Sequence, residues 1–419
     1  MNADAGAQTG LPARTAASVV LPFAFAYFLS YVYRSINAVI SPDLIADFSL
    51  SAAELGLLTS AYFLAFACFQ IPVGILLDRF GPRRVNAALF VLAAAGALVF
   101  SLSQSFTTLL AGRALIGLGV SAGLMSSIKV FTIWFPMERL PAITGRILFV
   151  GGLGAMAATV PVETLLGITD WRGVFRIASL LTLVAALALY FVVPERDTTR
   201  RHETWSEQLG GVGRVFRSAV FWRIAAASAV FQAINMAVQG LWAGPWLMDV
   251  AGLDRDAVAG HLLALAAATM IGFLGWGLAA FKLARHGIST RAWFKTGPAL
   301  FIAVLVLLTL GGTTGAGILW AAFGLFGTAS SLSFSILSQA FPVTMTGRAN
   351  TALNLIVFSS AFAFQWLFGA VVGLWPGESG HYHPDGYRAA FALLLILEIL
   401  AFGWLMIGTR TLKTASAVS

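Results

Sequence analysis

The chain is poor in charged residues, which make up only 11% of its 419 residues, whereas 58% are apolar. Soluble domains carry about 25% charged residues. A deficit of this size over this length excludes an ordinary soluble enzyme and indicates a polytopic membrane protein. Cysteine is scarce too, because Cys68 is the only one. An intramolecular disulfide is therefore excluded, and a metal–thiolate site is unsupported.

Several kinds of chemistry lack their motifs. The sequence contains no glycine-rich nucleotide-binding loop with its lysine, so ATP-driven transport is not indicated and no cofactor is expected. It also contains no set of nucleophile and base residues, so an enzyme is not expected. The cluster His381-Tyr382-His383 is interpreted as a solvated loop rather than a metal site. No nucleic-acid partner is expected, because the net charge of +8 has a topological explanation.

Long apolar runs dominate what is present. Twelve of them are long enough to span a bilayer, which predicts an all-α membrane protein. The expected spans are 17–40, 54–77, 84–104, 107–135, 141–168, 173–193, 220–248, 257–281, 291–311, 315–341, 348–374 and 387–408. The longest polar break separates six spans from six. It predicts an N-terminal bundle at 1–193, a linker at 194–219 and a C-terminal bundle at 220–419. Within the linker, the spacing of Trp205, Leu209 and Val212 predicts a surface helix.

The positive charges are distributed unevenly between the two sides of the predicted topology. Most of the 26 Lys and Arg residues fall in loops on the side that also holds both termini. The other side holds Arg172, Arg176, Arg255 and Arg388. Basic residues are retained in the cytoplasm, so both termini are expected there, with the protein in a bacterial cytoplasmic membrane.

One charged hinge separates the second and third apolar runs. It contains Gly74, Asp78, Arg79, Gly81, Arg83 and Arg84 in the pattern G-x-x-x-D-R-x-G-x-R-R. This pattern resembles the signature loop between helices 2 and 3 of the major facilitator superfamily of transporters. The resemblance implies two six-helix bundles around a central cavity. It also implies that the hinge is a gating element, in which Asp78 and Arg79 meet the neighbouring bundle and clamp the outward-open state.

Further matches extend the resemblance over nearly the whole chain. The segment Thr144-Gly145-Arg146 recurs as Thr346-Gly347-Arg348 about 200 residues later, which indicates two related halves. Arg113-x-x-x-Gly117-x-Gly119 resembles the second motif of the superfamily, which implies a structural or gating role for Arg113. The Gly-Pro ending of helix 5 that is typical of drug/proton antiporters is absent, because Val160 precedes Pro161.

Charged residues inside the bilayer are candidates for function, because burying them in hydrocarbon is costly. The predicted spans place Arg34, Arg113 and Glu163 roughly 8–10 Å below the periplasmic boundary, in one layer. Three interpretations of this layer stay open. Arg34 binds an anionic substrate through its guanidinium, or Glu163 neutralises Arg34 or Arg113 and holds helices together. In the third, the arginine side chain extends to the membrane surface.

The helical spacing favours a polar cavity around Arg34. Tyr27, Tyr31 and Arg34 fall on one face of the first helix. The segment from Tyr31 to Arg34 resembles the helix 1 region of organophosphate and organic-anion transporters, which implies an arginine for the anionic group of the substrate. Lys129 is a second candidate cation, either in the cavity or directed to the membrane surface.

The C-terminal half offers mainly amides and an indole. Asn235, Gln239 and Trp242 share a broad face and are candidates for binding the uncharged part of a solute, or for bonds between packed helices. Glu398 lies in the middle of the last span, where it is either a proton-coupling residue or faces a partner helix.

Together these features predict a secondary transporter that moves a small organic anion (a carboxylate, sulfonate or phosphate ester) by alternating access. Proton-coupled symport is what the resemblance implies, and a monomer in the lipid bilayer is expected. A proton-coupled exporter of drugs or metabolites and a transporter-like sensor remain as alternatives.

Overall fold

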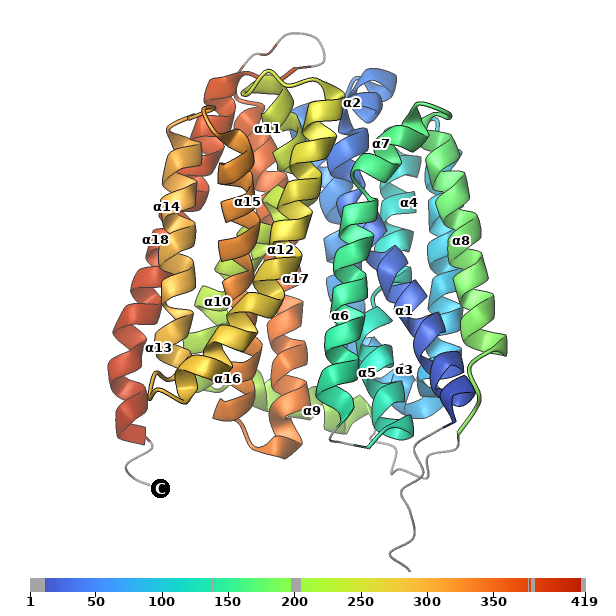
Figure 1. Ribbon diagram of the computed structural model, residues 1–419, viewed down its shortest axis with the longest axis vertical. Helices are drawn as coiled ribbons and strands as arrows, with labels where there is room; N and C mark the ends of the chain where they lie inside the picture. Colours follow the sequence, from blue (N-terminus) through green and yellow to red (C-terminus); the bar gives the residue numbers. More distant parts are fainter. Residues whose placement is uncertain (1–11, 137–138, 197–204, 376, 378–380, 416–419) are drawn as a thin grey trace, which may run out of the picture.

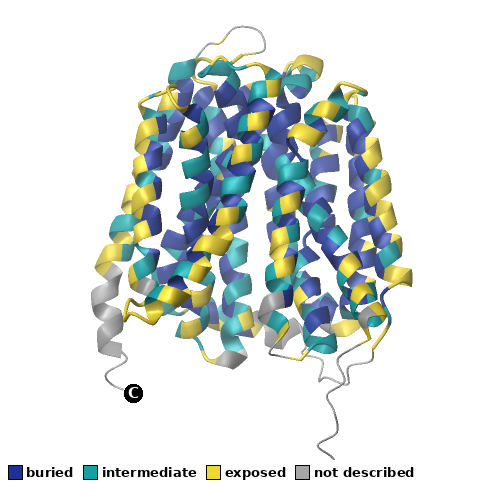
Figure 2. Cartoon of the chain, viewed as in Figure 1, coloured by how far each residue is buried: buried dark blue, intermediate teal, exposed yellow. Residues whose placement is uncertain are grey.

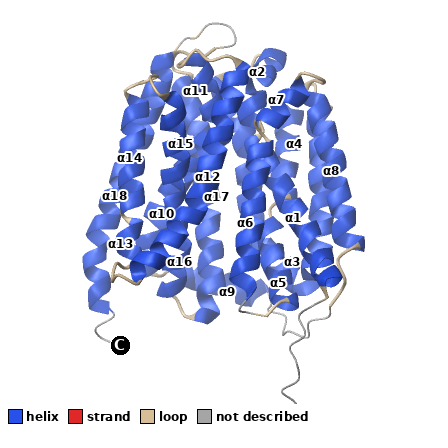
Figure 3. Cartoon of the chain, in the orientation of Figure 1, coloured by secondary structure: helices blue, strands red, loops and turns tan. Residues whose placement is uncertain are grey.

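The computed structural model describes residues 12–136, 139–196, 205–375, 377 and 381–415. Every regular element in these ranges is helical, and none is a strand (Figure 3). The all-α prediction is therefore confirmed for the described part of the chain.

The first half of the chain forms eight α-helices. They are α1 (Ala13–Ser35), α2 (Asn37–Phe48), α3 (Ala52–Ser101), α4 (Phe106–Gly119), α5 (Gly123–Trp134), α6 (Leu140–Ala157), α7 (Val160–Leu166) and α8 (Trp171–Phe191). The short amphipathic helix α9 (Trp205–Phe216) connects this half to the second half. The elements of the second half are α10 (Ala219–Ala237), the π-helix η2 (Val238–Trp242), α11 (Ala243–Asp249), α12 (Arg255–Ala284), α13 (Thr290–Phe294), α14 (Thr296–Thr309), α15 (Ala316–Gly327), the 3₁₀-helix η3 (Thr328–Ser331), α16 (Leu332–Ala340), α17 (Val343–Val372) and α18 (Pro384–Ala415).

Twelve stretches within the described residues are helical, long and apolar enough to cross a membrane. They agree with the twelve predicted spans within several residues at each end. Large apolar side chains on their outer faces support a lipid environment: Phe191 is 73% exposed, Ile318 80% and Ile407 77%. Such residues alternate with buried ones along the outer helices (Figure 2). In water this surface would drive aggregation, whereas in a bilayer it is solvated.

The two halves of the chain lie side by side (Figure 1). Helices α1 to α8 form one group, and α10 to α18 form the other. The start of α1 and the end of α18 lie at the same end of the molecule, which we call the termini end, and helix α9 crosses there. The opposite end, with α2, α7 and α11, is called the distal end. Helix α9 confirms the predicted surface helix, whereas residues 197–204 of the predicted linker lie outside the described residues.

Breaks in the helices position the candidate site. Helix α1 is interrupted at Ile36 and the chain continues as α2 to Phe48, so the first membrane helix extends well beyond its predicted end at residue 40. Helix α3 contains two spans that meet at Gly81, whose φ of 78° requires a residue without Cβ. The fourth span is broken between Gly119 and Gly123, and the seventh changes to a π-helix at Val238. Such single-turn π segments are frequent at functional sites.

Candidate functional site

Arg34 lies where the two halves of the chain meet. Its guanidinium carbon is 4.5 Å from the centre of the Tyr31 ring and 5.3 Å from that of Phe358, which belongs to α17 of the other half. The Nε of Arg34 is buried and has no hydrogen-bond partner. Among the described residues, no carboxylate forms an ion pair with Arg34, and the titratable groups that act on its charge are the tyrosines Tyr31, Tyr62 and Tyr27. The charge is therefore placed between aromatic rings without an anionic partner.

The depth of Arg34 differs from the prediction. Because α2 continues to Phe48, Arg34 lies 14 residues before the end of the first membrane helix, or about 21 Å along its axis. Its contact Phe358 lies near the middle of α17. Arg34 is thus near the centre of the bundle rather than within 10 Å of the boundary. The prediction failed because the apolar run ends at Ile40, while the helix itself does not.

The predicted stripe of two phenols and an arginine forms as a contact group. The Tyr27 hydroxyl donates to that of Tyr31 at 3.3 Å, and the two rings meet edge-on with centroids 5.1 Å apart. Helix α6 packs against the rings of Tyr27 and Tyr31. A Cβ at Gly151 would lie 2.6 Å from Tyr27 Cε1 and 3.1 Å from Tyr31 Cδ2. A Cβ at Gly154 would lie 2.3 Å from the Phe28 carbonyl oxygen. These two glycines of α6, which is part of the fifth membrane span, thus allow close packing against α1. This span lacks the Gly-Pro ending that is typical of the antiporters.

Arg113 lies buried beside the end of α1. Its side chain is fully buried, and its Nη1 donates to the Tyr33 carbonyl oxygen at 2.9 Å, in the last turn of α1. The rings of Tyr62 and Phe100 lie 5.6 and 5.9 Å from its guanidinium carbon. It therefore satisfies a carbonyl at the α1–α2 break, where helical partners end. The glycines of its motif allow close approach, since a Cβ at Gly117 would lie 2.2 Å from the Tyr62 carbonyl oxygen.

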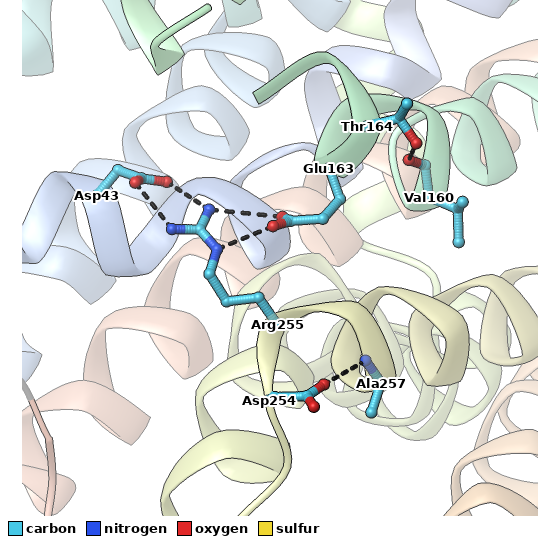
Figure 4. A network of polar contacts seen from close by, with 7 residues as sticks. All are labelled: Asp43, Val160, Glu163, Thr164, Asp254, Arg255 and Ala257. Carbon is cyan, nitrogen blue, oxygen red and sulfur yellow. Dashed lines mark hydrogen bonds and ion pairs between the residues drawn. The ribbon is translucent and has the colours of Figure 1, made fainter. Parts of the chain in front are cut away.

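Glu163 forms an ion pair, but with neither Arg34 nor Arg113. It pairs with Arg255, the first residue of α12, whose Nε lies 2.9 Å from Glu163 Oε1. Arg255 also holds both oxygens of Asp43 in α2, at 2.9 and 2.8 Å (Figure 4). Asp43 lies nine residues beyond Arg34, about 13 Å further along the helix axis. The expected layer of Arg34, Arg113 and Glu163 is therefore wrong, because Glu163 lies at the distal end.

We call Arg255, Asp43 and Glu163 the triad; it connects the two halves of the chain at the distal end. Tyr382 makes a second connection between the halves. The Tyr382 hydroxyl, in the loop before α18, donates to the Leu50 carbonyl oxygen at 3.3 Å. Between them the backbones touch, since a Cβ at Gly244 of α11 would lie 2.1 Å from the Ala38 carbonyl oxygen. From the sequence, Asp43 is not a candidate and Arg255 is assigned only to a loop. The signal for both was weak, because each lies next to an apolar run and resembles an ordinary boundary charge.

A pocket of about 720 Å³ opens outside this triad, at the distal end. It is not the preferred anion site, because its walls carry more carboxylates than guanidinium groups; the charged lining residues are Asp43, Asp47, Glu163, Asp170, Arg172, Arg255 and Asp256. Within it, the Trp171 indole donates to Asp47 at 2.9 Å, and Arg172 pairs with the same carboxylate. The hydrogen bond from Trp171 and then the contact with Arg172 lower the pKa of Asp47.

The candidates in the second half separate into different roles. Trp242 is fully buried, donates to the Gln365 carbonyl oxygen at 3.0 Å and stacks on Phe368. Asn235 is buried against Gly327, because a Cβ there would lie 2.1 Å from its Nδ2. Gln239 instead lines a small cavity between the two halves, together with Ser35 and Thr159. The structure does not bring these three side chains together on one cavity wall, because the π-helix η2 changes the helical register between Asn235 and Trp242.

Lys129 lies on α5 and is half-buried. Its helix neighbours Ser126 and Ser127 are buried, and both donate to the Gly123 carbonyl oxygen rather than to another helix. Gly123 faces Tyr27, since a Cβ there would lie 3.6 Å from Tyr27 Cδ2. Lys129 is six residues, or about 9 Å, further toward the termini end.

Central contacts between α3 and α17 were not anticipated. Phe66 stacks on Phe358 with centroids 4.0 Å apart, and Asn354 Nδ2 donates to Gln70 Oε1 at 2.9 Å. Sequence patterns offer no means to pair Asn354 with Gln70, which is 284 positions away.

The charged hinge packs against its own half. Arg83 Nε donates to the Tyr190 carbonyl oxygen at 2.8 Å, and Arg84 pairs with Glu195 at 2.6 Å. Arg79 is exposed, and its guanidinium lies 5.3 Å from the Phe80 ring. Gly74 is half-buried in α3. The side chain of Asp78 lies outside the described residues, so its expected contact with the other half stays a prediction.

Glu398 is fully buried in α18, and neither carboxyl oxygen has a hydrogen-bond partner among the described residues. Ser228 of α10 also has an unpaired buried oxygen, and α10 packs against α18. An ionised carboxylate without a partner would be very costly there, so this environment suits the neutral acid.

Comparisons with known proteins agree with this architecture. The model of the Major Facilitator Superfamily matches residues 23–365. The nitrate/nitrite transporter NrtP of Picosynechococcus sp. is 34% identical over 121 residues, which are 29% of this chain and 22% of the relative. The hexuronate transporter of Escherichia coli is 25% identical over 213 residues, 47% of this chain and 49% of the relative. The probable sulfoacetate transporter SauU of Cupriavidus necator is 24% identical over 43% of this chain and 42% of its own. The matches thus span less than half the length of these relatives.

Solved structures extend the similarity to the whole fold. A bacterial homologue of the human lysosomal transporter Spinster, in an inward-facing and occupied conformation, superposes with a TM-score of 0.78 at 19% identity. The superposition covers 96% of this chain and 98% of that one. These relatives and neighbours are named as transporters and not as enzymes, which agrees with the expectation from the sequence. Since the family model covers most of the chain and the twelve helical spans match the fold, the chain belongs to the Major Facilitator Superfamily.

Proposed function

We propose that this protein is a secondary transporter that moves a small organic anion across the bacterial cytoplasmic membrane by alternating access. The observation that carries the proposal is Arg34, a guanidinium near the centre of the bundle, at the contact of the two halves, with no carboxylate partner among the residues that the structure describes. A buried cation without a counter-charge is costly, and an anionic substrate can supply that charge. The hexuronate and sulfoacetate transporters among the relatives also have names that specify organic anions.

The position of the contacts between the halves supports the proposal of alternating access. Arg255, Tyr382 and Gly244 join them at the distal end, and Asn354 joins them near the centre. Opening the distal end requires these contacts to break while the halves, at 1–193 and 220–419, rock about the central site. With the termini end in the cytoplasm, this conformation is closed to the outside.

The proposal also includes coupling of anion transport to protons. Moving an anion inward against the membrane potential costs about 2.3 kcal/mol per charge per 100 mV, which co-transport of a proton offsets. The candidate proton carriers are Glu398 and the two carboxylates that pair with Arg255, Asp43 and Glu163. Each lies in a half that must move during alternating access. The functional unit is a monomer, because both halves of the site come from one chain.

A thermal-shift screen of the purified protein against organic anions, amino acids, sugars and cations tests the substrate class. We expect organic anions to raise the unfolding temperature and Arg34→Gln to abolish that shift while the unliganded protein still folds and inserts. Arg388→Gln, at an exposed pair with Asp385, is the matched control and should keep the shift. Stabilisation by neutral or cationic solutes only, or wild-type anion affinity in Arg34→Gln, would contradict the proposal.

A further inference from the structure

The surroundings of Arg34 narrow the chemistry of its ligand. We infer that Arg34 binds an anion with a single negative charge and a flat aromatic body, of the arenecarboxylate class. This inference rests on the proposed function and specifies the substrate class at the same site. Three features of the described residues carry it: the number of cations within reach, the rings around the guanidinium and the engagement of nearby polar groups.

Of the three predicted intramembrane cations, Arg34 is the one whose guanidinium is placed to meet a small ligand here. The side chain of Arg113 is fully buried, and its Nη1 is used on the Tyr33 carbonyl oxygen. Lys129 lies about 9 Å beyond Gly123, which faces Tyr27, and Tyr27 is itself seven residues, or about 10 Å, from Arg34. The backbones of Arg34 and Lys129 are thus roughly 19 Å apart along the bundle axis. A dianion held at Arg34 would keep one charge without a partner, which favours a monoanion.

Aromatic rings form the walls of this position. Tyr31 and Phe358 lie against the guanidinium at 4.5 and 5.3 Å, and its buried Nε, which has no partner among the described residues, remains for a carboxylate. The Phe358 ring continues into a cluster with Phe66, at 4.0 Å, and Phe63, at 5.9 Å. Aromatic pairs contribute beyond the area that they bury, and a flat ligand ring would join this cluster.

The amide nitrogens near this position already donate, whereas the buried oxygens Asn37 Oδ1 and Gln365 Oε1 have no partner in the described part of the chain. Gln70 and Asn354 bond to each other, and Asn37 Nδ2 donates to Thr59 at 2.9 Å. Gln365 Nε2 donates to the Ala237 carbonyl oxygen at 3.2 Å, and Trp242 donates to the Gln365 carbonyl. A polyhydroxylated anion would bury more hydroxyl groups than these two oxygens can satisfy, which is costly. An aromatic body avoids that cost.

Direct binding measurements on the full-length protein in detergent test this inference. The probes are benzoate, its neutral analogue benzamide, the dianion phthalate, the small anion acetate and the sugar acid glucuronate. We expect benzoate to bind at least about tenfold more tightly than acetate, phthalate or glucuronate, and benzamide not to bind. Phe358→Leu should reduce the preference for benzoate over acetate several-fold. Phe191→Leu, on the lipid-facing surface, should leave it unchanged.

The possible outcomes separate the inference from the proposed function. Tighter binding of glucuronate, phthalate or acetate than of benzoate, lost in Arg34→Gln, overturns the aromatic class and leaves anion transport standing. An unchanged preference in Phe358→Leu overturns the role of the ring cluster and with it the inference. Binding of benzamide alone, or absence of anion binding to protein that is folded by circular dichroism, overturns both.

Discussion

Arg255 and Asp43 meet end to end across the two halves of the chain, with Nη1 and Nη2 of the arginine 2.9 and 2.8 Å from the two carboxylate oxygens. Glu163 holds the Nε of the same guanidinium, so one residue of α12 is fastened to both α2 and α7 (Figure 4). Bidentate guanidinium–carboxylate pairs are strong and geometrically specific. A contact of this kind between the two halves is suited to hold the distal end closed.

Arg255→Gln should therefore shift the protein toward conformations that are open at the distal end. With Cys68 replaced by alanine, a cysteine at Ser35, which lines the internal cavity, reports on access from the distal side. We expect labelling of this cysteine by a membrane-impermeant thiol reagent to become several-fold faster in Arg255→Gln, because losing a bidentate pair costs about 1–3 kcal/mol.

The matched control for this experiment is Arg388→Gln, which removes an exposed arginine that pairs only locally with Asp385, three residues away at the same end. Labelling should stay at the wild-type rate there. Equal acceleration in both variants would mean that general loosening of the distal end, and not the contact of Arg255 with Asp43 and Glu163, controls access.

Arg113 should matter for folding more than for transport specificity. Arg113→Gln removes the donor to the buried Tyr33 carbonyl oxygen and shortens a fully buried side chain. An unpaired buried carbonyl and the loss of packing together cost roughly 2–4 kcal/mol. We expect a clear fall in the unfolding temperature in detergent, whereas the ranking of ligands by thermal shift should be unchanged. An altered ranking at wild-type stability would assign Arg113 to the binding site instead.

Asp47 gives the distal end a defined response to acid. Its hydrogen bond from Trp171 and its contact with Arg172 lower its pKa in the folded protein. A group with a lowered folded pKa contributes stability that is complete above its unfolded pKa, near 4, and that is lost as the pH falls through the folded value. Wild-type protein should thus lose stability below about pH 4 more steeply than Asp47→Asn. Parallel unfolding temperatures of the two proteins between pH 6 and pH 3 would contradict this assignment.

The hinge at Gly74–Arg84 makes a separate prediction. Arg83 and Arg84 are bound within their own half, at Tyr190 and Glu195, in the conformation that is closed at the distal end. The resemblance to the superfamily implies that Asp78 acts in the opposite, outward-open state. Asp78→Asn should therefore slow transport in proteoliposomes while ligand binding to the purified protein stays within about twofold of wild type. Equal loss of binding and transport would indicate a folding defect instead.

The sequence predicted the elements that depend on composition and local pattern. Twelve spans, the surface helix at Trp205 and the stripe of Tyr27, Tyr31 and Arg34 follow from hydropathy and helical periodicity, and all are present in the structure. The partners of the charges did not follow. Glu163 meets Arg255 across 92 positions, and α2 continues the first helix past the end of its apolar run. Pairing across helices depends on tilt and on helix breaks, which periodicity does not encode.

Two glycines of α6 provide the sharpest test of how the phenols are positioned. A Cβ at Gly151 would lie 2.6 Å from Tyr27 Cε1, whereas a Cβ at Gly145 in the same helix would meet nothing within 4 Å. Both substitutions by alanine raise helix propensity equally, so any difference between them reports on the contact with Tyr27. Gly151→Ala should displace Tyr27 and Tyr31, move the ring that covers Arg34 and weaken anion binding by about tenfold or more, in line with the 1–3 kcal/mol cost of overpacking. Gly145→Ala should bind like wild type. Because Gly151→Ala keeps Arg34 itself, retained affinity in this variant would show that the tyrosines do not set the geometry of the arginine.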